Sequence, residues 1–340
     1  MLPTIATADQ TIVVDLDRPT LDRWMYPFNA EPGTRAEAMS FGALGIPNFF
    51  DDRDAQFIIG FDTVPTVPAG LGLPAYQIQS ARLTVTISTN ETFVYDPTFD
   101  SFETYLDEQN GLYEPDGDAG RPIEVYGLGF LNGFGRFSFQ ESTVFSFGDP
   151  TLEGVRNAYA LGFLSNGDPV DVSNNVRDQF EVVPFAIGQI DGLAPGTPVP
   201  SETDVTFDLD LTNPDVVAYL QSSLNDGRLL LTVSSLHDAS QGGDVTYPRY
   251  YTKEKGLSEF FDYEARLDLE VIIPDASTPA VLTDATVIFG SLLSGGLEEL
   301  TESDDQRLRA RSQFGFSALE PDLMILRIGA ETYVSQPAVL

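Results

Sequence analysis

The sequence predicts an all-β protein: a jelly-roll-like antiparallel β-sandwich with one short helix and a small C-terminal β segment. Glycine (29 residues) and proline (23 residues) interrupt the 340-residue chain so often that long helices do not fit between them. Asn-Gly and Asp-Gly pairs, which favour tight turns between antiparallel strands, begin at residues 110, 116, 132, 166, 191 and 226. Many short segments of strand character between such turns favour a sandwich over a parallel α/β sheet.

The expected strands are runs rich in β-branched, aromatic and aliphatic residues, several of which alternate with polar residues. In the run 82–88, Leu83, Val85 and Ile87 fall on one face. Runs of the same kind cover 10–15, 55–61, 205–211, 228–233 and 265–273.

One segment has the pattern of a helix. Residues 213–224 place Val217, Leu220 and Leu224 at helical intervals. Asn213 is a suitable N-cap, proline follows it in the first turn, and Asp226-Gly227 provides a stop. We therefore predict a single short helix here.

The segment 274–280, Pro-Asp-Ala-Ser-Thr-Pro-Ala, has the composition of a linker and divides the chain. Residues 5–273 form the predicted sandwich domain, and residues 281–340 form a small or incomplete C-terminal β segment with strands near 285–290, 322–329 and 332–335. So few strands make a marginal core on their own. Either this segment packs on the sandwich, or it opens a domain that continues past Leu340.

Charge limits the partners that the chain can bind. The 52 acidic and 18 basic residues give a formal charge of -34, which repels nucleic acids and anionic lipid surfaces. Two uses of this charge stay open, solubility in a salty extracellular medium and cation binding.

The chain has no cysteine, which excludes disulfides and thiolate chemistry, and it has no apolar run of about 20 residues that would insert in a membrane.

Three stretches in order resemble a known family. They are residues 53–85, where a strand ending in Phe61-Asp62 precedes a proline loop and Ser80-Ala81-Arg82-Leu83; residues 205–231, a strand, the helix and Asn225-Asp226-Gly227; and residues 250–271, a turn and a final strand. This order is similar to the DNRLRE-type domain, a β-sandwich of carbohydrate-binding-module character on secreted and cell-surface bacterial proteins. The resemblance implies an extracellular or cell-surface location, no catalysis, and a polysaccharide or cell-surface glycan as partner. The segment 90–200 is longer than this family carries and is expected to be a central insertion.

Sugar binding on a sandwich relies on aromatic faces and a few placed polar groups. Two proline-flanked aromatic clusters qualify, and Arg249 and Lys253 give the second one a basic spot that suits an anionic polysaccharide. The predicted ligand-binding residues are Trp24, Tyr26, Tyr247, Arg249, Tyr250, Tyr251 and Lys253. The alternative is that these aromatic side chains cap the core.

Calcium is the ion that the acidic loops favour, because it takes oxygen ligands without strict geometry. The candidate ligands are Asp51, Asp52 and Asp54 in one loop, and Asp116 and Asp118 in another. Asp168 and Asp171 form a further acidic pair. Solvated turn residues are the alternative, since none of these loops matches an EF-hand.

Catalysis is not expected. His237 is the only histidine, and no Gly-x-Ser-x-Gly motif is present. We therefore expect a non-catalytic extracellular carbohydrate-binding or surface-adhesion module. The alternative is a structural subunit of an extracellular filament or surface layer, which self-associates when its C-terminal strands complete a neighbour's sheet.

Overall fold

The computed structural model describes residues 9–239, 245–258 and 263–274, together with the C-terminal strands at 285–291, 296–299, 323–328 and 331–335. The chain divides into two units, residues 1–275 and 276–340. No helix in the described part of the chain is long and apolar enough to cross a membrane.

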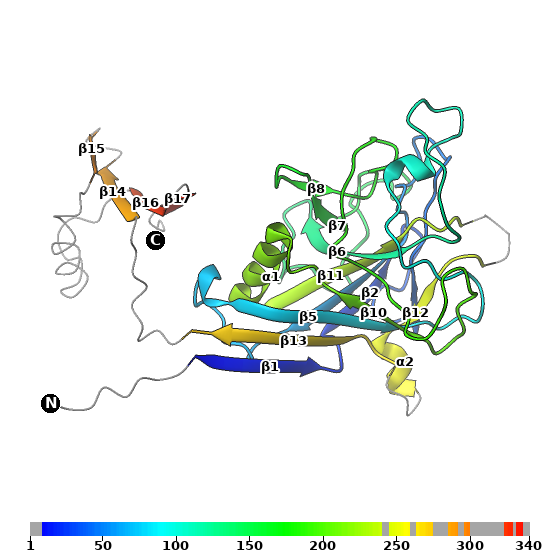
Figure 1. Ribbon diagram of the computed structural model, residues 1–340, viewed down its shortest axis with the longest axis horizontal. Helices are drawn as coiled ribbons and strands as arrows, with labels where there is room; N and C mark the ends of the chain where they lie inside the picture. The colour runs from blue at the N-terminus through cyan, green and yellow to red at the C-terminus, as the bar shows by residue number, and fades with distance from the viewer. Residues whose placement is uncertain are drawn as a thin grey trace. The chain divides into compact units, whose positions relative to one another are not determined.

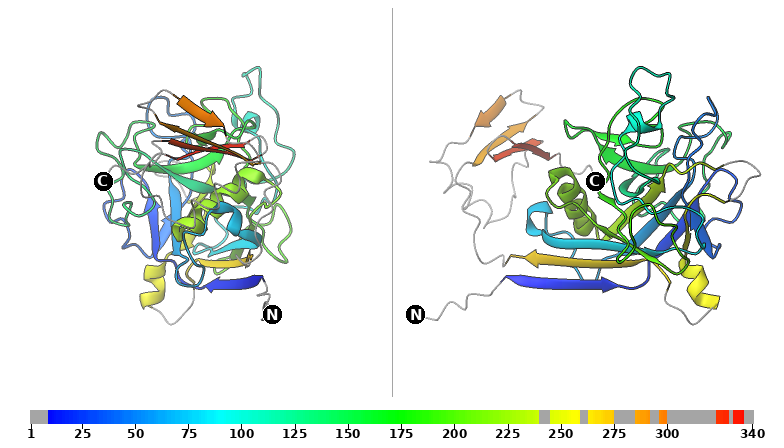
Figure 2. Two further views of the ribbon diagram at one scale, coloured as in Figure 1. Left: turned by 90° about the vertical axis from the view of Figure 1, so that its left-hand side faces the viewer. Right: turned by 45° about the vertical axis from the view of Figure 1, so that its right-hand side comes forward.

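The first unit is built on two antiparallel sheets (Figure 1). The smaller sheet has the order β1–β13–β5–β10, with β1 (Gln10–Leu16), β13 (Arg266–Ile273), β5 (Gln77–Thr86) and β10 (Asp204–Asp208). The larger sheet has the order β2–β4–β11–β6–β7–β8, and β9 also pairs with β6. Its strands are β2 (Leu21–Met25), β4 (Gln56–Asp62), β11 (Arg228–Ser235), β6 (Ile123–Phe130), β7 (Ala158–Phe163), β8 (Pro169–Asp171) and β9 (Ala186–Ile187). Figure 2 shows β1, β13 and β5 side by side in blue, gold and cyan.

Alternation along the strands creates the core between the two sheets. Leu83, Val85 and Ile87 are fully buried, as their spacing predicts, and they join one apolar cluster with Phe57 of β4 and Leu231 of β11. At about 25 cal/mol for each Å2 of apolar surface removed from water, this cluster is the main source of stability. The predicted all-β sandwich is confirmed.

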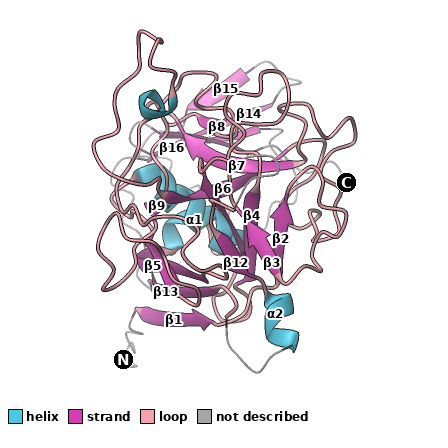
Figure 3. Cartoon of the chain, turned by 90° about the vertical axis from the view of Figure 1, so that its right-hand side faces the viewer, coloured by secondary structure: helices cyan, strands magenta, loops and turns pink. Residues whose placement is uncertain are grey.

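The outer face of the larger sheet is also covered. Phe139 and Phe145, from the loop between β6 and β7, pack with Met25, Ile58 and Leu128 of the sheet. The segment 90–200 thus supplies four strands of the larger sheet and part of its cover, so it is integral to the sandwich. The long loops of this unit, pink in Figure 3, run over the strands.

The predicted helix is present as α1 (Pro214–Asp226). The Asn213 side chain accepts a hydrogen bond of 3.0 Å from the backbone N–H of Asp215, and Gly227 ends the helix with a positive φ of 89°. Leu220 and Leu224 are buried, whereas Val217 is half-buried because Val216 takes its place toward the core. The helix packs on β11 and β5.

Smaller elements complete the unit. The strands β3 (Glu37–Met39) and β12 (Arg249–Tyr251) pair with each other, and α2 (Lys253–Ser258) follows β12 directly. Two 3₁₀ turns, η1 (Leu73–Ala75) and η2 (Phe102–Tyr105), lie in the loops after β4 and β5.

The second unit contains a four-stranded antiparallel sheet of order β15–β14–β16–β17. Its strands are β14 (Ala285–Ser291), β15 (Gly296–Glu299), β16 (Leu323–Ile328) and β17 (Glu331–Ser335). These strands pair with one another. Strand complementation between copies of the chain, the alternative drawn from the sequence, stays a prediction.

Candidate functional site

Four aromatic side chains from separate parts of the chain line one pocket beside the larger sheet. Tyr26 follows β2, Phe41 and Phe50 lie in the loops between β3 and β4, and Tyr247 precedes β12. The pocket has a volume of about 160 Å3, and we call it the aromatic pocket. The other residues that line it are Gly42, Ala43, Ile46, Asp54 and Ala239.

The aromatic rings form a continuous series from the core to the surface. Tyr26 stacks on Trp24 with 4.5 Å between ring centroids, and Phe41 lies 5.3 Å from Tyr26 and 4.6 Å from Tyr247. Phe28, which is 55% exposed, contacts the rings of Tyr26 and Phe50 at 5.5 and 5.7 Å. The rings that line the pocket are therefore packed against one another.

Close backbone packing shapes the wall at Gly42. Phe41 forms a β-bridge with Ala55, and the Gly42 N–H donates to the carbonyl oxygen of His237 at 2.7 Å. A Cβ atom at Gly42 would lie 2.9 Å from the carbonyl oxygen of Asp52, so glycine is needed for this approach.

Among the described residues that line the aromatic pocket, Asp54 is the one acidic residue. Its side chain is 4% exposed, and its Oδ1 atom finds no hydrogen-bond partner among the described residues. Burial raises the pKa of Asp54 to about 7, with Arg156 opposing and Asp51 adding to the shift. Burial and the nearby Asp54 also raise the pKa of Tyr26 to about 12. The pocket thus combines aromatic faces with a buried acceptor that lacks a donor.

Three larger hollows, of about 320, 640 and 680 Å3, lie elsewhere on the described surface. Loop residues line most of them, including Pro32, Ser142 and Asn166. None of the residues that line these hollows contributes an unpartnered buried side-chain atom among those described. The aromatic pocket is therefore the stronger candidate for a specific ligand.

Three predicted ligand-binding residues meet at this pocket. Tyr26 and Tyr247 line it, and Trp24 supports Tyr26 from the core side. Sequence reasoning missed Phe41 and Phe50, which are far from these residues in the chain. It also assigned Asp54 to a metal.

The other predicted ligand-binding residues are not among those that line the aromatic pocket. Tyr250 is fully buried, stacks on Phe57 at 5.6 Å and shares a hydrogen bond of 2.7 Å with the Ser40 hydroxyl. Tyr251 stacks on Tyr263 at 4.6 Å. These two tyrosines are separated because β12 is a strand, not a loop, and its neighbouring side chains point to opposite sides.

The basic spot is neutralised in the structure. Arg249 lies 3.6 Å from a carboxylate oxygen of Glu37, and Lys253 forms an ion pair with Glu141. These cations have carboxylate partners within the protein, and their role in holding an anionic polysaccharide stays a prediction.

The predicted calcium ligands Asp51 and Asp52 are engaged by arginines. Asp51 pairs with Arg156 at 2.5 Å, and Asp52 pairs with Arg177 at 3.0 Å. Asp54 is among the residues that line the aromatic pocket instead. The three carboxylates of this loop therefore have different neighbours and do not converge on one metal position.

Asp116 and Asp118 lie in an acidic loop region. Asp118 offers a carboxylate oxygen within 4.8 Å of those of Asp96 and Asp100. Asp116 instead pairs with Arg121 at 3.0 Å, and Arg121 also binds Asp100 at 2.8 Å. Of the further pair, Asp168 accepts a hydrogen bond from the Asn166 side-chain amide at 2.7 Å, and Asp171 accepts one from the Ser173 N–H at 2.8 Å.

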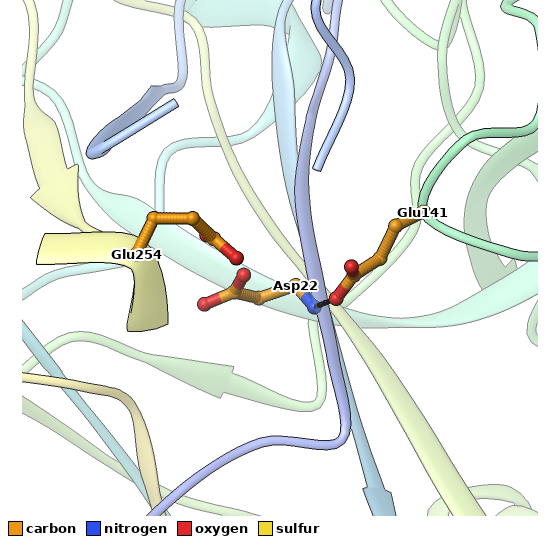
Figure 4. A group of neighbouring side chains, drawn as sticks. All are labelled: Asp22, Glu141 and Glu254. Atoms are coloured by element: carbon orange, nitrogen blue, oxygen red, sulfur yellow. Dashed lines mark hydrogen bonds between the residues drawn. The ribbon is translucent and has the colours of Figure 1, made fainter. Parts of the chain in front are cut away.

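A second acidic group consists of Asp22, Glu141 and Glu254, which the sequence did not predict (Figure 4).

His237 is buried, with its ring edge against Phe93 at 5.2 Å. Neither ring nitrogen has a hydrogen-bond partner among the described residues. Burial, with a smaller contribution from Arg121, lowers the pKa of His237 to about 3. Its contacts are those of a neutral core side chain and not of a triad base, which needs a nucleophile in reach.

Comparisons of the chain with models of protein families, with curated proteins and with solved structures found no match. The resemblance to a DNRLRE-type domain therefore stays a prediction that depends on the sequence motifs.

Proposed function

We propose that this chain is a non-catalytic carbohydrate-binding or surface-adhesion module that acts outside the cell and holds one sugar ring of a glycan in the aromatic pocket. The observation that carries the proposal is Asp54, a buried carboxyl with an unpartnered oxygen in a pocket of four aromatic side chains. A buried acceptor without a donor is unfavourable by about 1 to 3 kcal/mol, and a ligand hydroxyl would remove that penalty.

The chemistry of a sugar ring fits the aromatic pocket in two ways. Its C–H faces stack on aromatic rings such as Tyr26 and Tyr247, while its hydroxyls donate to the Asp54 carboxylate. The pocket of about 160 Å3 is small beside drug-sized sites, which favours a single ring of a longer chain. Exposed Phe28 extends the aromatic wall beyond the pocket, where a neighbouring sugar unit would lie.

The absence of catalysis is part of this proposal. A glycosidase needs two carboxyls on either side of the scissile bond. Among the described residues that line the pocket, Asp54 is the only carboxyl, and His237 is buried with its nitrogens unpartnered. Extracellular placement follows from the resemblance, and the large negative charge suits such a medium.

The test is a glycan array probed with the full chain and with three variants. Tyr247→Ala removes one wall of the pocket, and Asp54→Asn removes the anionic acceptor. Phe147→Ala is the matched control, because Phe147 is an exposed aromatic residue that contacts Phe134, which is not among the pocket residues.

We expect the wild-type chain and Phe147→Ala to bind the same glycans, and Tyr247→Ala and Asp54→Asn to lose at least tenfold in affinity. Aromatic cages with a carboxylate also bind quaternary ammonium groups. Silence on the array together with choline binding that Tyr247→Ala abolishes would contradict the glycan proposal.

A further inference from the structure

Three carboxylates converge at the edge of the larger sheet. Asp22 belongs to the edge strand β2, Glu254 to the first turn of α2, and Glu141 to the loop between β6 and β7 (Figure 4). Each offers an oxygen within 4.8 Å of the others. We call this group the edge carboxylates.

Two of these carboxylates face each other without a donor between them. Asp22 is fully buried, and its Oδ2 atom accepts the backbone N–H of Lys253 at 2.7 Å. Its Oδ1 atom has no hydrogen-bond partner among the described residues, and neither has the buried Oε2 atom of Glu254. Figure 4 shows the carboxyl groups of Asp22 and Glu254 pointing toward each other. Such an arrangement is unfavourable unless a cation or a proton lies between them.

The charges nearby do not balance. Lys253 brings one cation to this group, and its ammonium is bonded to Glu141 and lies 3.2 Å from the Thr20 carbonyl oxygen. Arg23 follows Asp22 in the chain. Its guanidinium donates hydrogen bonds to the carbonyl oxygens of Gln140, Glu141 and Thr143. The three carboxylates outnumber the two cations, Lys253 and Arg23, so a negative charge remains that a bound cation would neutralise.

We propose that the edge carboxylates bind one Ca2+ ion, with Asp22 and Glu254 as direct ligands and Glu141 at the rim. Calcium suits this group because it accepts oxygen ligands in flexible geometry, including carboxylates from separate segments. Burial, with repulsion from Glu254, raises the pKa of Asp22, and burial, with repulsion from Glu141, raises the pKa of Glu254. Calcium would displace the proton that these shifts favour and would tie β2, α2 and the Glu141 loop together.

The other group of three carboxylates, in the loop after β5, provides an internal control. Asp96, Asp100 and Asp118 also lie within 4.8 Å of one another, but Arg121 binds Asp100 and Asp118 is exposed. The Asp118 carboxylate accepts the Thr98 hydroxyl at 2.7 Å. Asp118→Asn therefore changes the charge of an acidic group while it leaves the edge carboxylates intact.

The experiment is thermal unfolding and calorimetric titration of the chelator-treated full chain with CaCl2 and, separately, with MgCl2. We expect one Ca2+ per chain, a saturable rise in melting temperature, and a weaker response to Mg2+, which demands stricter geometry. Glu254→Gln should abolish the Ca2+ response, and Asp118→Asn should retain it. Because Glu254 is only half-buried, its variant is expected to fold.

Without calcium, Glu254→Gln should melt at a higher temperature than the wild-type chain, since the substitution relieves the repulsion of Asp22. Asp22→Asn, if it folds, should also lose the Ca2+ response. The proposal is overturned if the wild-type chain binds no Ca2+, or if the response survives in Glu254→Gln and disappears in Asp118→Asn. These results are independent of glycan binding.

Discussion

The phenol ring of Tyr26 stacks on the indole of Trp24, with 4.5 Å between their centroids and 16° between their planes. Trp24 belongs to the sandwich core, whereas Tyr26 lines the aromatic pocket. The pair therefore connects the rigid part of the fold to the proposed ligand. Because Trp24 is the single tryptophan of the chain, its fluorescence reports on this pocket.

Glycan affinity should increase with pH. Burial raises the pKa of Asp54 to about 7, so the carboxylate that accepts sugar hydroxyls forms only as the pH rises through that value. Calorimetry between pH 5.5 and 8.5 should show tighter binding at the alkaline end for the wild-type chain. Asp54→Asn should bind weakly with little pH dependence. Tighter binding at pH 5.5 than at pH 8.5 would contradict the acceptor role.

His237→Phe should stabilise the protein, most of all in acid. The folded chain keeps His237 neutral to about pH 3, while the unfolded chain takes up a proton near pH 6.5. The wild-type chain therefore loses up to about 1.4 kcal/mol of stability for each pH unit below 6.5 through this group. Urea unfolding at pH 7 and pH 4.5 measures the effect. The variant's advantage should be larger at pH 4.5, and an equal or smaller advantage there would show that His237 protonates in the folded state.

Tyr250→Phe should leave glycan binding unchanged and lower the free energy of unfolding by about 1 kcal/mol, because it removes one buried hydrogen bond to Ser40. Tyr250→Ala also removes a fully buried ring and should cost about 3 to 5 kcal/mol, the range known for buried phenylalanine. Denaturant unfolding of both variants gives these values. A loss of glycan affinity in Tyr250→Phe would show instead that Tyr250 contributes to glycan binding.

Glu124→Gln should be strongly destabilising. Arg53 and Glu124 form an ion pair with both side chains buried, and Arg53 also donates to the Asn175 amide oxygen at 3.1 Å. Removing one charge leaves the other without its partner, at a cost of about 3 to 5 kcal/mol. The double variant Arg53→Met with Glu124→Met should lose less than Glu124→Gln alone. Urea unfolding of this double variant and of the single variants Arg53→Met and Glu124→Met completes a double-mutant cycle, and additive losses would disprove the coupling.

The fold could be predicted from the sequence because its signals are local. The helix α1 has its N-cap Asn213, its first-turn proline and its terminal Gly227 within one short segment. The strand β5 carries the alternation of Leu83 and Val85 in the same way. These patterns need no knowledge of distant residues.

The candidate site could be predicted only in part, because its residues are distant in sequence. Tyr26, Phe41 and Tyr247 meet only after β2 and the β3–β12 pair are placed beside each other, and no local pattern connects them. The proline-flanked cluster 247–251 indicated aromatic binding residues, but the strand β12 directs Tyr250 into the core. The acidic loops were too numerous for the sequence to show that Asp51 and Asp52 have arginine partners.

The central claim is that a glycan binds in the aromatic pocket. A fluorescence titration of Trp24 with the glycan selected on the array tests it most directly, with wild-type, Tyr247→Ala and Phe147→Ala chains. The account predicts a saturable change in Trp24 emission for the wild-type chain and Phe147→Ala, and a dissociation constant at least tenfold higher for Tyr247→Ala. Equal dissociation constants for all three chains would contradict it.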